Sequence, residues 1–192
     1  AYGMERKNPQ LIALHQHNEA QAAQAVMELL RTGQRIAYVS DAGTPAISDP
    51  GARLVQAVRE AGLPVVPLPG ASSVTTLLSV AGLDTLGDAN TGFIFTGFLP
   101  NKAMERSRAV LELQKETRAV VLLEAPHRMA ALASALSILG ERVLSIGREL
   151  TKQFETIRTG SIVDVKSFIE SDPNQQRGEF VVLVSAVVEH SI

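Results

Sequence analysis

The sequence predicts an α/β protein, because short apolar runs alternate with amphipathic segments along most of its 192 residues. Several of these runs are followed by a turn containing Gly or Pro and then by a helical pattern, which is the order of strand–loop–helix units. Apolar residues make up 45% and charged residues 20%, so a chain of this length can bury a core without disulfides or metals. Cysteine is absent, which excludes disulfides and thiol nucleophiles.

The first part of the chain predicts three helices and two strands. Asn18 is typical of an N-cap, and the helical pattern after it ends at Gly33. Residues 35–40 (RIAYVS) predict a buried strand, and Asp49 followed by Pro50 indicates the start of the next helix. The remaining predicted elements are the helix that runs to about residue 62, a strand at 64–68 and a helix at 71–81.

A linker is predicted at residues 82–92 (GLDTLGDANTG), which are rich in turn formers. We therefore expect two α/β domains, residues 1–88 and 89–192, with a cleft between them as the usual place for a ligand. The predicted strands of the second domain are 93–96, 118–123, 142–146, 154–159 and 179–187. Its predicted helices are 102–115, 126–139 and 162–171, and residues 172–177 are a polar loop.

Charge and composition narrow the choice of partner. The net charge is −2, with 6 basic and 8 acidic residues up to residue 90 and 12 of each after it, so charge alone does not indicate nucleic acid. No apolar run is long enough for a membrane span, and residues 1–10 have no signal-peptide core. The only close histidine pair, His15 and His17, has no third ligand nearby in sequence, so we expect no metal.

The clearest chemical signal is Ser40-Asp41-Ala42-Gly43-Thr44-Pro45, which follows the predicted strand at 35–40. In open α/β sheets, ligands bind beyond the carboxyl ends of strands. A glycine lets a ligand approach the backbone, and the Asp41 carboxylate and nearby N–H groups can hold a polar cofactor edge. A plain strand-to-helix turn, in which Asp41 or Thr44 satisfies local donors, explains the pattern equally well.

A second signal is Pro69-Gly70-Ala71-Ser72-Ser73, where small residues open a helix after a glycine turn. A helix N-terminus of this kind suits a carboxylate or phosphate, although capping of the helix by its own serines is the stronger interpretation of the pattern alone. The motifs GxxxxGK[ST], GxGxxG and GxSxG are all absent, which disfavours a nucleotide-triphosphate enzyme, a nicotinamide enzyme and a serine hydrolase.

Two further charged segments follow predicted strands. Glu124 and His127 are candidates for proton transfer and Arg128 for phosphate binding, while an ion pair between Glu124 and Arg128 beside an exposed His127 is the alternative. The segment Arg148-Glu149-Leu150-Thr151-Lys152 either lines a cleft or covers a solvated loop, and the pattern alone favours the loop.

Taken in order, these segments resemble the signature blocks of one family, the ribosomal-RNA ribose 2′-O-methyltransferase branch of the tetrapyrrole methylases. The matching blocks are LHQHNE (14–19), SDAGTPAISDPG (40–51), PLPGASSVTTLLSVAGL (67–83), GFLP (97–100), LLEAPHRM (122–129), GRELTKQFE (147–155) and RGEFVVLV (177–184). EAPHR and RELTK point to the ribosomal branch rather than the porphyrin and corrin branches.

The resemblance implies two α/β lobes as in tetrapyrrole methylases, the first with a parallel sheet that lacks its first strand here and the second with a mixed sheet. It also implies a cytoplasmic homodimer with S-adenosyl-L-methionine in the cleft and 16S ribosomal RNA or the small ribosomal subunit as partner. The implied cofactor-binding residues are Asp41, Ala42, Gly43, Thr44 and Ile47 for the methionine and ribose part, Ala71, Ser72 and Ser73 beside them, and Leu123, Gly178 and Phe180 for the adenine.

The family pattern also begins earlier and ends later than this chain. Its opening strand and PxPIGN-type loop have no counterpart here, and its C-terminal extension beyond Val188 is missing. We therefore expect weak or no methyl transfer by this chain alone.

For the reaction itself, a ribose 2′-hydroxyl attacks the methyl group of the sulfonium, and alignment should carry most of the rate. The candidate catalytic residues are Glu124 as general base, with Arg148 or Lys152 as a cation that stabilises the developing alkoxide. Two alternatives remain, a tetrapyrrole- or corrin-type small-molecule methyltransferase and a non-catalytic nucleoside-binding module.

Overall fold

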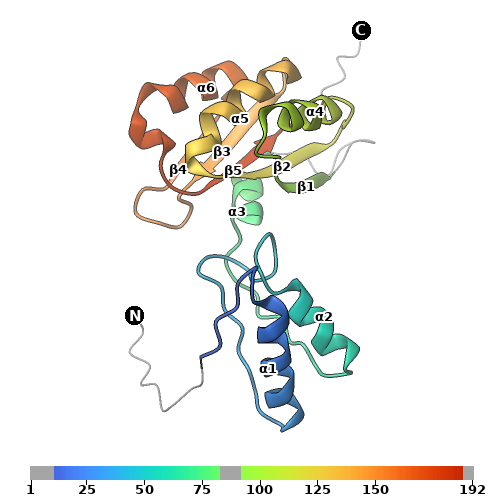
Figure 1. Ribbon diagram of the computed structural model, residues 1–192. Coiled ribbons are helices and arrows are strands. Elements are labelled where there is room, and N and C mark those ends of the chain that lie inside the picture. Colours follow the sequence, from blue (N-terminus) through green and yellow to red (C-terminus); the bar gives the residue numbers. More distant parts are fainter. Residues whose placement is uncertain (1–10, 83–91, 188–192) are drawn as a thin grey trace. The chain divides into compact units, whose positions relative to one another are not determined.

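The computed structural model describes residues 11–82 and 92–187, and the chain divides into two compact units, Ala1–Ala71 and Ser72–Ile192. Figure 1 labels the helices and strands along the chain, and each unit has a hydrophobic core of its own. Composition predicts the division at residue 88, but residues 83–91 lie outside the described part. The helix at 73–80 packs on the sheet of the second unit, which is why the observed division falls before it.

The first unit is built on two helices, α1 (Glu19–Arg31) and α2 (Ala52–Glu60). Apolar residues recur every three or four positions on each helix, so each has one apolar stripe. The stripes meet in a small core of Ala23, Val26, Met27, Leu54 and Val58.

The starts of these helices are stabilised differently from the sequence prediction. Asn18 precedes α1 as expected, but its side chain binds the preceding turn, accepting from His15 N–H at 2.8 Å and donating to the Ala13 carbonyl at 2.8 Å. The prediction that Asp49 caps the next helix is wrong. Helix α2 begins at Ala52, and the Glu19 carboxylate accepts from the N–H groups of Gly51 (2.9 Å) and Arg53 (3.1 Å).

The predicted parallel sheet of the first unit is also not observed. Residues 35–40 and 64–68, both predicted as strands, form no ladder within the described residues. Their apolar side chains remain exposed, with Val39 78%, Val66 75% and Leu68 84% accessible. A strand is stable only when a neighbour satisfies its backbone groups, and no described segment supplies that neighbour.

The second unit carries a five-stranded sheet of order β1-β2-β5-β3-β4. Strands β1 and β2 are parallel and the other three pairings are antiparallel, so the sheet is mixed, as expected for the second lobe. In chain order the elements are α3 (Ser73–Val80), β1 (Phe93–Phe98), α4 (Ala103–Leu113), β2 (Ala119–Glu124), η1 (Pro126–Arg128), α5 (Met129–Leu136), η2 (Ser137–Leu139), β3 (Val143–Arg148), β4 (Thr156–Ser161), α6 (Ile162–Ser171), η3 (Pro173–Gln176) and β5 (Phe180–Val184).

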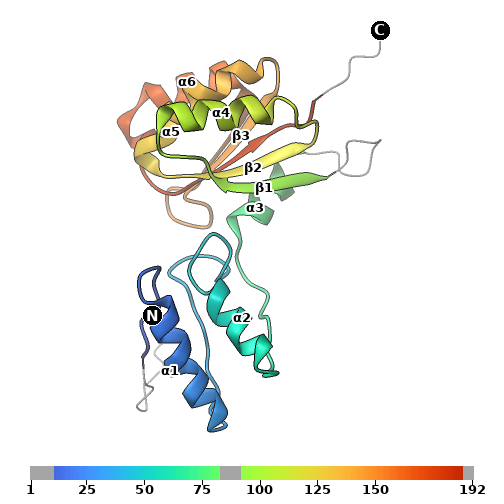
Figure 2. The same cartoon turned by 45° about the vertical axis from the view of Figure 1, so that its right-hand side comes forward.

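The two central strands, β2 and β5, are apolar on both faces because both faces are covered. Helices α4, α5 and α6 lie on one face and α3 lies on the other (Figure 2). Val120, Leu122 and Val182 enter the core under α4–α6, whereas Val121 and Leu183 pack against Leu77 of α3. Continuous apolar runs, rather than alternating ones, are the expected pattern for such strands.

Most predicted elements of the second unit are confirmed to within two or three residues, and α6 matches at both ends. The predicted helix at 126–139 is interrupted, since it contains η1, α5 and η2 in succession. The α/β class predicted from the alternation is therefore correct. No helix in residues 11–82 and 92–187 is both long and apolar enough to span a bilayer.

Candidate cofactor and catalytic site

The two glycine-containing turns of the first unit lie side by side. Thr44 Oγ1 donates to the Ala71 carbonyl at 3.0 Å, and a Cβ built on Gly43 would lie 3.7 Å from the same oxygen. Ser40 Oγ closes the first turn by donating to the Gly43 carbonyl at 2.9 Å. Gly43 and Thr44 thus lie next to Ala71, although Thr44 and Ala71 are 27 positions apart in the chain.

The rest of this loop has an unusual backbone. Ala46 and Ser48 have φ values of 65° and 53°, in the left-handed region that residues with a Cβ rarely adopt. Ile47 lies between them with 54% of its surface exposed. Such backbone conformations are concentrated at ligand sites and switch regions, which agrees with a ligand-binding role for the loop.

Ser72 and Ser73 stand at the start of α3, in the second unit. Ser72 is at the N-cap position with an extended backbone, but its hydroxyl makes no capping hydrogen bond. The alternative interpretation, in which these serines exist only to cap their helix, is therefore not supported for Ser72.

The candidate residues of the second unit lie near one another at one end of the strands β2, β5 and β3. Glu124 pairs with Phe180 and Phe180 with Arg148, so these residues form one row across β2, β5 and β3. The row lies on the face covered by α4–α6, because Phe180 belongs to that core. Leu123, the neighbour of Glu124, points to the opposite face and packs in the cluster around α3.

Glu124 is enclosed, with none of its side chain exposed. Its Oε1 accepts from Ala125 N–H at 2.8 Å and lies 3.0 Å from Arg128 Nε, while Oε2 has no partner among the described residues. Arg128 in turn donates to Asn101 Oδ1 and to the Leu99 carbonyl, the latter at 2.7 Å. The ion pair predicted as the alternative is present, and the hydrogen bonds of Arg128 to Leu99 and Asn101 join the segment after β2 to the loop after β1.

The side chain of Arg148 also forms its hydrogen bonds with other residues of this chain. Its guanidinium, on a residue only 8% exposed, donates to the carbonyls of Arg177 (2.7 Å), Phe154 (3.1 Å) and Asn174 (2.9 Å) and to Thr156 Oγ1 (3.1 Å). These contacts join the end of β3 to the start of β4, with the loop before it, and to the segment between α6 and β5. They favour a structural role for Arg148 and leave Lys152 as the more accessible of the two candidate cations.

Lys152 has 42% of its side chain exposed and binds two carboxylates, Glu149 Oε1 at 3.2 Å and Glu179 Oε2 at 2.8 Å. The hydrogen bond to Glu179 is the main cause that raises the pKa of the Lys152 ammonium, and Glu149 adds to it against the opposing effect of burial. Because its proton is held more tightly, Lys152 suits the role of a cation and not that of a base.

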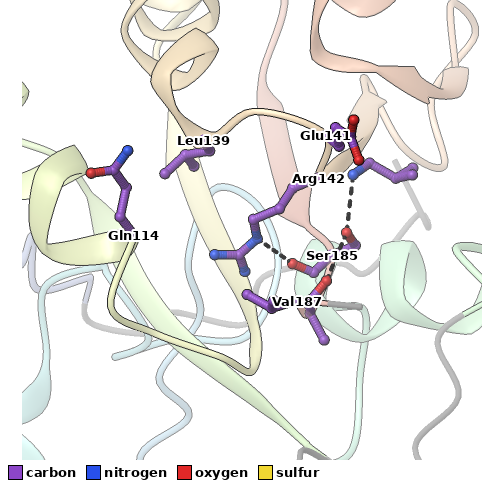
Figure 3. A pocket seen from close by; sticks show the side chains of 8 residues that line it. Gln114, Leu139, Glu141, Arg142, Ser185 and Val187 are labelled. Atoms are coloured by element: carbon purple, nitrogen blue, oxygen red, sulfur yellow. Dashed lines mark hydrogen bonds between the residues drawn. The ribbon is translucent and has the colours of Figure 1, made fainter. Parts of the chain in front are cut away.

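A cavity of about 500 Å³ lies at the opposite edge of the same sheet (Figure 3). The side chains that line it include Arg142, whose guanidinium donates to the Ser185 carbonyl at 2.6 Å and to the Arg118 carbonyl at 2.9 Å. Its other donors reach the carbonyls of Leu113 (3.2 Å) and Glu116 (3.1 Å). Through these bonds Arg142 joins the end of β5 to the segment that precedes β2. None of the predicted site residues lines the cavity.

Glu149 is a further functional candidate, which the sequence pattern does not indicate. It lies in the charged segment at residues 148–152, where residue type alone does not distinguish it from its neighbours. Its contact with Gly178 is what distinguishes this glutamate, and no local sequence pattern shows a contact between residues so far apart in the chain. Among the described residues no group of three or more His, Asp or Glu is arranged to hold a metal ion.

The α/β architecture, the mixed sheet of the second unit and the polar loops at the ends of its strands define the class of the protein. A family model described as Tetrapyrrole (Corrin/Porphyrin) Methylases matches residues 4–166, and the chain belongs to this family.

Within the family, the chain is similar to proteins named ribosomal RNA small subunit methyltransferase I. It is 42% identical over 185 residues to that of Neisseria meningitidis serogroup B, which covers 96% of this chain and 61% of the relative. It is 47% identical over 174 residues to that of Vibrio cholerae, covering 90% of this chain and 59% of the relative. The chain therefore spans about three fifths of the length of these relatives.

Solved structures agree on the fold. The methyltransferase CobJ superposes with a TM-score of 0.63 at 19% identity, over 91% of this chain and 74% of that one. The cobalt precorrin-4 methyltransferase CbiF gives a TM-score of 0.62 at 17% identity, over 86% of this chain and 70% of that one. The α/β fold predicted from the family resemblance is thereby confirmed.

Proposed function

We propose that this chain is part of an S-adenosylmethionine-dependent methyltransferase that methylates a ribose 2′-hydroxyl of 16S ribosomal RNA. The observation that carries the proposal is its 42–47% identity, over at least 90% of its length, to proteins named ribosomal RNA small subunit methyltransferase I. A cytoplasmic location and a homodimer are proposed with it, on the family resemblance.

The residues of the first unit suit the amino-acid end of the cofactor. Two backbone turns meet where Gly43 and Thr44 lie beside Ala71, and the Thr44 hydroxyl donates to the Ala71 carbonyl at this contact. Asp41 supplies an acceptor for an ammonium group, and exposed Ile47 supplies an apolar surface. We propose that Asp41, Ala42, Gly43, Thr44, Ile47 and Ala71 hold the methionine and ribose part, with Ser72 and Ser73 next to Ala71 in the chain.

The second unit is proposed to hold the adenine through Leu123, Gly178 and Phe180, at the edge of its sheet. A uroporphyrin-III C-methyl transferase from Thermus thermophilus, similar in fold, has been solved with S-adenyl homocysteine bound. That complex supports the use of the same cofactor in this family.

When bound, S-adenosylmethionine supplies a methyl group on a sulfonium, which needs no further activation than alignment with its acceptor. The chain's residues would orient the hydroxyl, exclude water and stabilise the charge that develops on the oxygen. We propose Lys152 as the cation at this oxygen. Glu124 is proposed as the base, and its enclosed carboxylate requires a shift of the Arg128 loop before it can accept a proton.

The test uses the protein that carries this chain, at the length of its relatives, with tritiated S-adenosylmethionine. We expect label in 16S RNA of small ribosomal subunits and none in a tetrapyrrole. Label in the tetrapyrrole alone would instead support a small-molecule methyltransferase. No binding of S-adenosylhomocysteine by calorimetry would support a non-catalytic module. Glu124→Gln with an unchanged rate would remove Glu124 as the base.

A further inference from the structure

The loop after β3 contains a glutamate in an unusual conformation. Glu149 has a φ of 49°, in the left-handed region, and only 19% of its side chain is exposed. Thr151, two residues later, has a φ of 65°. A residue with a Cβ persists in this region only where surrounding contacts hold it there, and for Glu149 those contacts can be named.

The main contacts join Glu149 to the start of β5 through both its backbone and its side chain. Its N–H donates to the Glu179 carbonyl at 3.0 Å, and its Oε1 accepts from the Glu179 N–H at 2.8 Å. The same Oε1 lies 3.2 Å from Lys152 Nζ, and the Lys152 N–H donates to the Glu149 carbonyl at 3.0 Å. One carboxylate therefore ties Lys152 to the turn that contains Gly178.

Gly178 fits under this carboxylate because it has no side chain. A Cβ built on it would lie 2.4 Å from Glu149 Cγ and 2.6 Å from Oε1, closer than any real contact of this kind. The glycine and the glutamate thus fit closely against each other, although they are 29 positions apart in the chain.

We infer that Glu149 is a positioning residue, which holds the Lys152 ammonium and the Gly178–Phe180 turn together as one rigid part of the site. Lys152 also contacts Glu179, but that carboxylate has 68% of its side chain exposed and Glu149 is the more constrained partner. The roles of Lys152 and Gly178 in the site rest on the proposed function. The way in which Glu149 holds them rests on the contacts alone.

The charged groups around Lys152 determine how replacing Glu149 changes the pKa of the Lys152 ammonium. The carboxylates of Glu149 and Glu179 face the ammonium, and Arg148 faces Glu149. The pKa of Glu149 is lowered, mainly by the hydrogen bond from Glu179 N–H, so this carboxylate is charged at neutral pH. Replacing it by an amide removes one negative charge from Lys152, lowers the pKa of the ammonium and increases its neutral fraction.

The test compares Glu149→Gln with Glu112→Gln, because Glu112 forms the same i,i+3 pair with Lys115 on an exposed helix end at 2.8 Å. Trace acylation at pH 8, read by mass spectrometry, measures each lysine separately. We expect Glu149→Gln to speed labelling of Lys152 about twofold to fivefold and to leave Lys115 unchanged. Glu112→Gln should leave Lys152 unchanged.

The second readout is catalytic. In a protein that transfers methyl groups, Glu149→Gln should lower kcat by about tenfold to a hundredfold with the circular dichroism spectrum preserved, and Glu112→Gln should not. Unchanged labelling of Lys152 would overturn the inference, and so would unchanged kcat in an active protein. If the unsubstituted protein methylates nothing, the proposed function fails, while the labelling ratio still decides whether Glu149 holds Lys152.

Discussion

Gly178 has a φ of +88°, and Glu149 lies directly against the position where a Cβ would be. Gly178→Ala therefore combines backbone strain with a steric clash, and we expect it to lower the free energy of unfolding by about 3–5 kcal/mol. Chemical denaturation followed by circular dichroism measures this loss.

Gly140→Ala is the matched control in the same unit. Gly140 has a φ of +69° with nothing within 4 Å of its added Cβ, so that variant is affected by the backbone strain alone. Equal losses in the two variants would show that Glu149 does not occupy the space over Gly178.

Among the described carboxylates, Glu116 has the pKa that differs most from its ordinary value. The side-chain hydrogen bond from Arg118, at 2.8 Å, is the main cause that lowers its pKa from the ordinary 4.5 to about 2. Because the folded pKa lies below the unfolded one, this pair stabilises the fold fully above about pH 4.5 and loses its effect as the pH falls towards 2.

Carbon NMR of the Glu116 carboxyl group measures this directly. We expect a titration midpoint near 2, and a midpoint closer to 4.5 in the Arg118→Gln variant. Arg108→Gln, which changes a distant exposed arginine, should leave the midpoint in place. A midpoint near 4.5 in the unsubstituted protein would contradict the Arg118 pair.

At the scale of elements, α3 belongs to the sheet of the second unit and not to the residues that precede it. Leu77 is fully buried and packs against Ala119, Val121, Val181 and Leu183. The same strands bury their alternate residues under α4–α6. This helix thus completes the second layer, without which one face of β2 and β5 would be exposed to water.

Leu77→Ala should therefore lower the free energy of unfolding of the second unit by about 2–5 kcal/mol, since the cavity it leaves is enclosed. Val80→Ala is the control, because Val80 lies at the end of the same helix with 52% of its surface exposed and should cost well under 1 kcal/mol. Urea titration followed by the circular dichroism of the sheet compares the free energies of unfolding of the two variants. Similar small effects for both variants would show that α3 is not docked on the sheet.

At the scale of the whole molecule, the two units differ in how completely their backbones are paired. Each of β2 and β5 is hydrogen-bonded to strands on both sides. Residues 35–40 and 64–68 of the first unit form no ladder in the described part and expose Val39, Val66 and Leu68. Unpaired apolar segments of this kind are also sites of association between chains.

Hydrogen exchange of the 192-residue chain tests this difference. We expect amides of Ala119–Glu124 and Phe180–Val184 to exchange at least on the order of a thousand times more slowly than those of 35–40 and 64–68. Dilution controls for self-association, because pairing between copies would protect the exposed segments at high concentration only. Strong protection of residues 64–68 at low concentration would contradict the unpaired backbone.

Several features were predictable from sequence because they depend on near neighbours in the chain. Local sequence patterns indicate both ends of the helix at 162–171. The runs at 119–124 and 180–184 are apolar throughout, which is typical of strands covered on both faces. The Gly43 turn and the small residues around Ala71 were recognisable by residue type. Their family resemblance was recognisable too, because the motifs occur in order along the chain.

Other features depend on contacts that no local pattern specifies. Residues 35–40 have the composition of a strand, but a strand exists only with a partner, so local propensity was not sufficient. Asp49-Pro50 looked like a helix start, yet a carboxylate from 32 residues earlier caps α2 at Gly51 instead. The charges of Glu124 and Arg148 predict candidate catalytic residues, but only the structure shows that Glu124 pairs with Arg128 and that Arg148 binds the carbonyls of Arg177 and Asn174.

The amino-acid sequence by itself determined the α/β class, the approximate bounds of most elements and the loops that carry polar residues, because each depends on periodicity and residue type over a few positions. The tertiary structure alone decided that α3 covers the second sheet, that Arg142 and Arg148 join strand ends, and that Glu149 closes over Gly178. These depend on which distant segments meet, and the free energy of such a meeting comes from burial and hydrogen bonds that form only once the chain has folded.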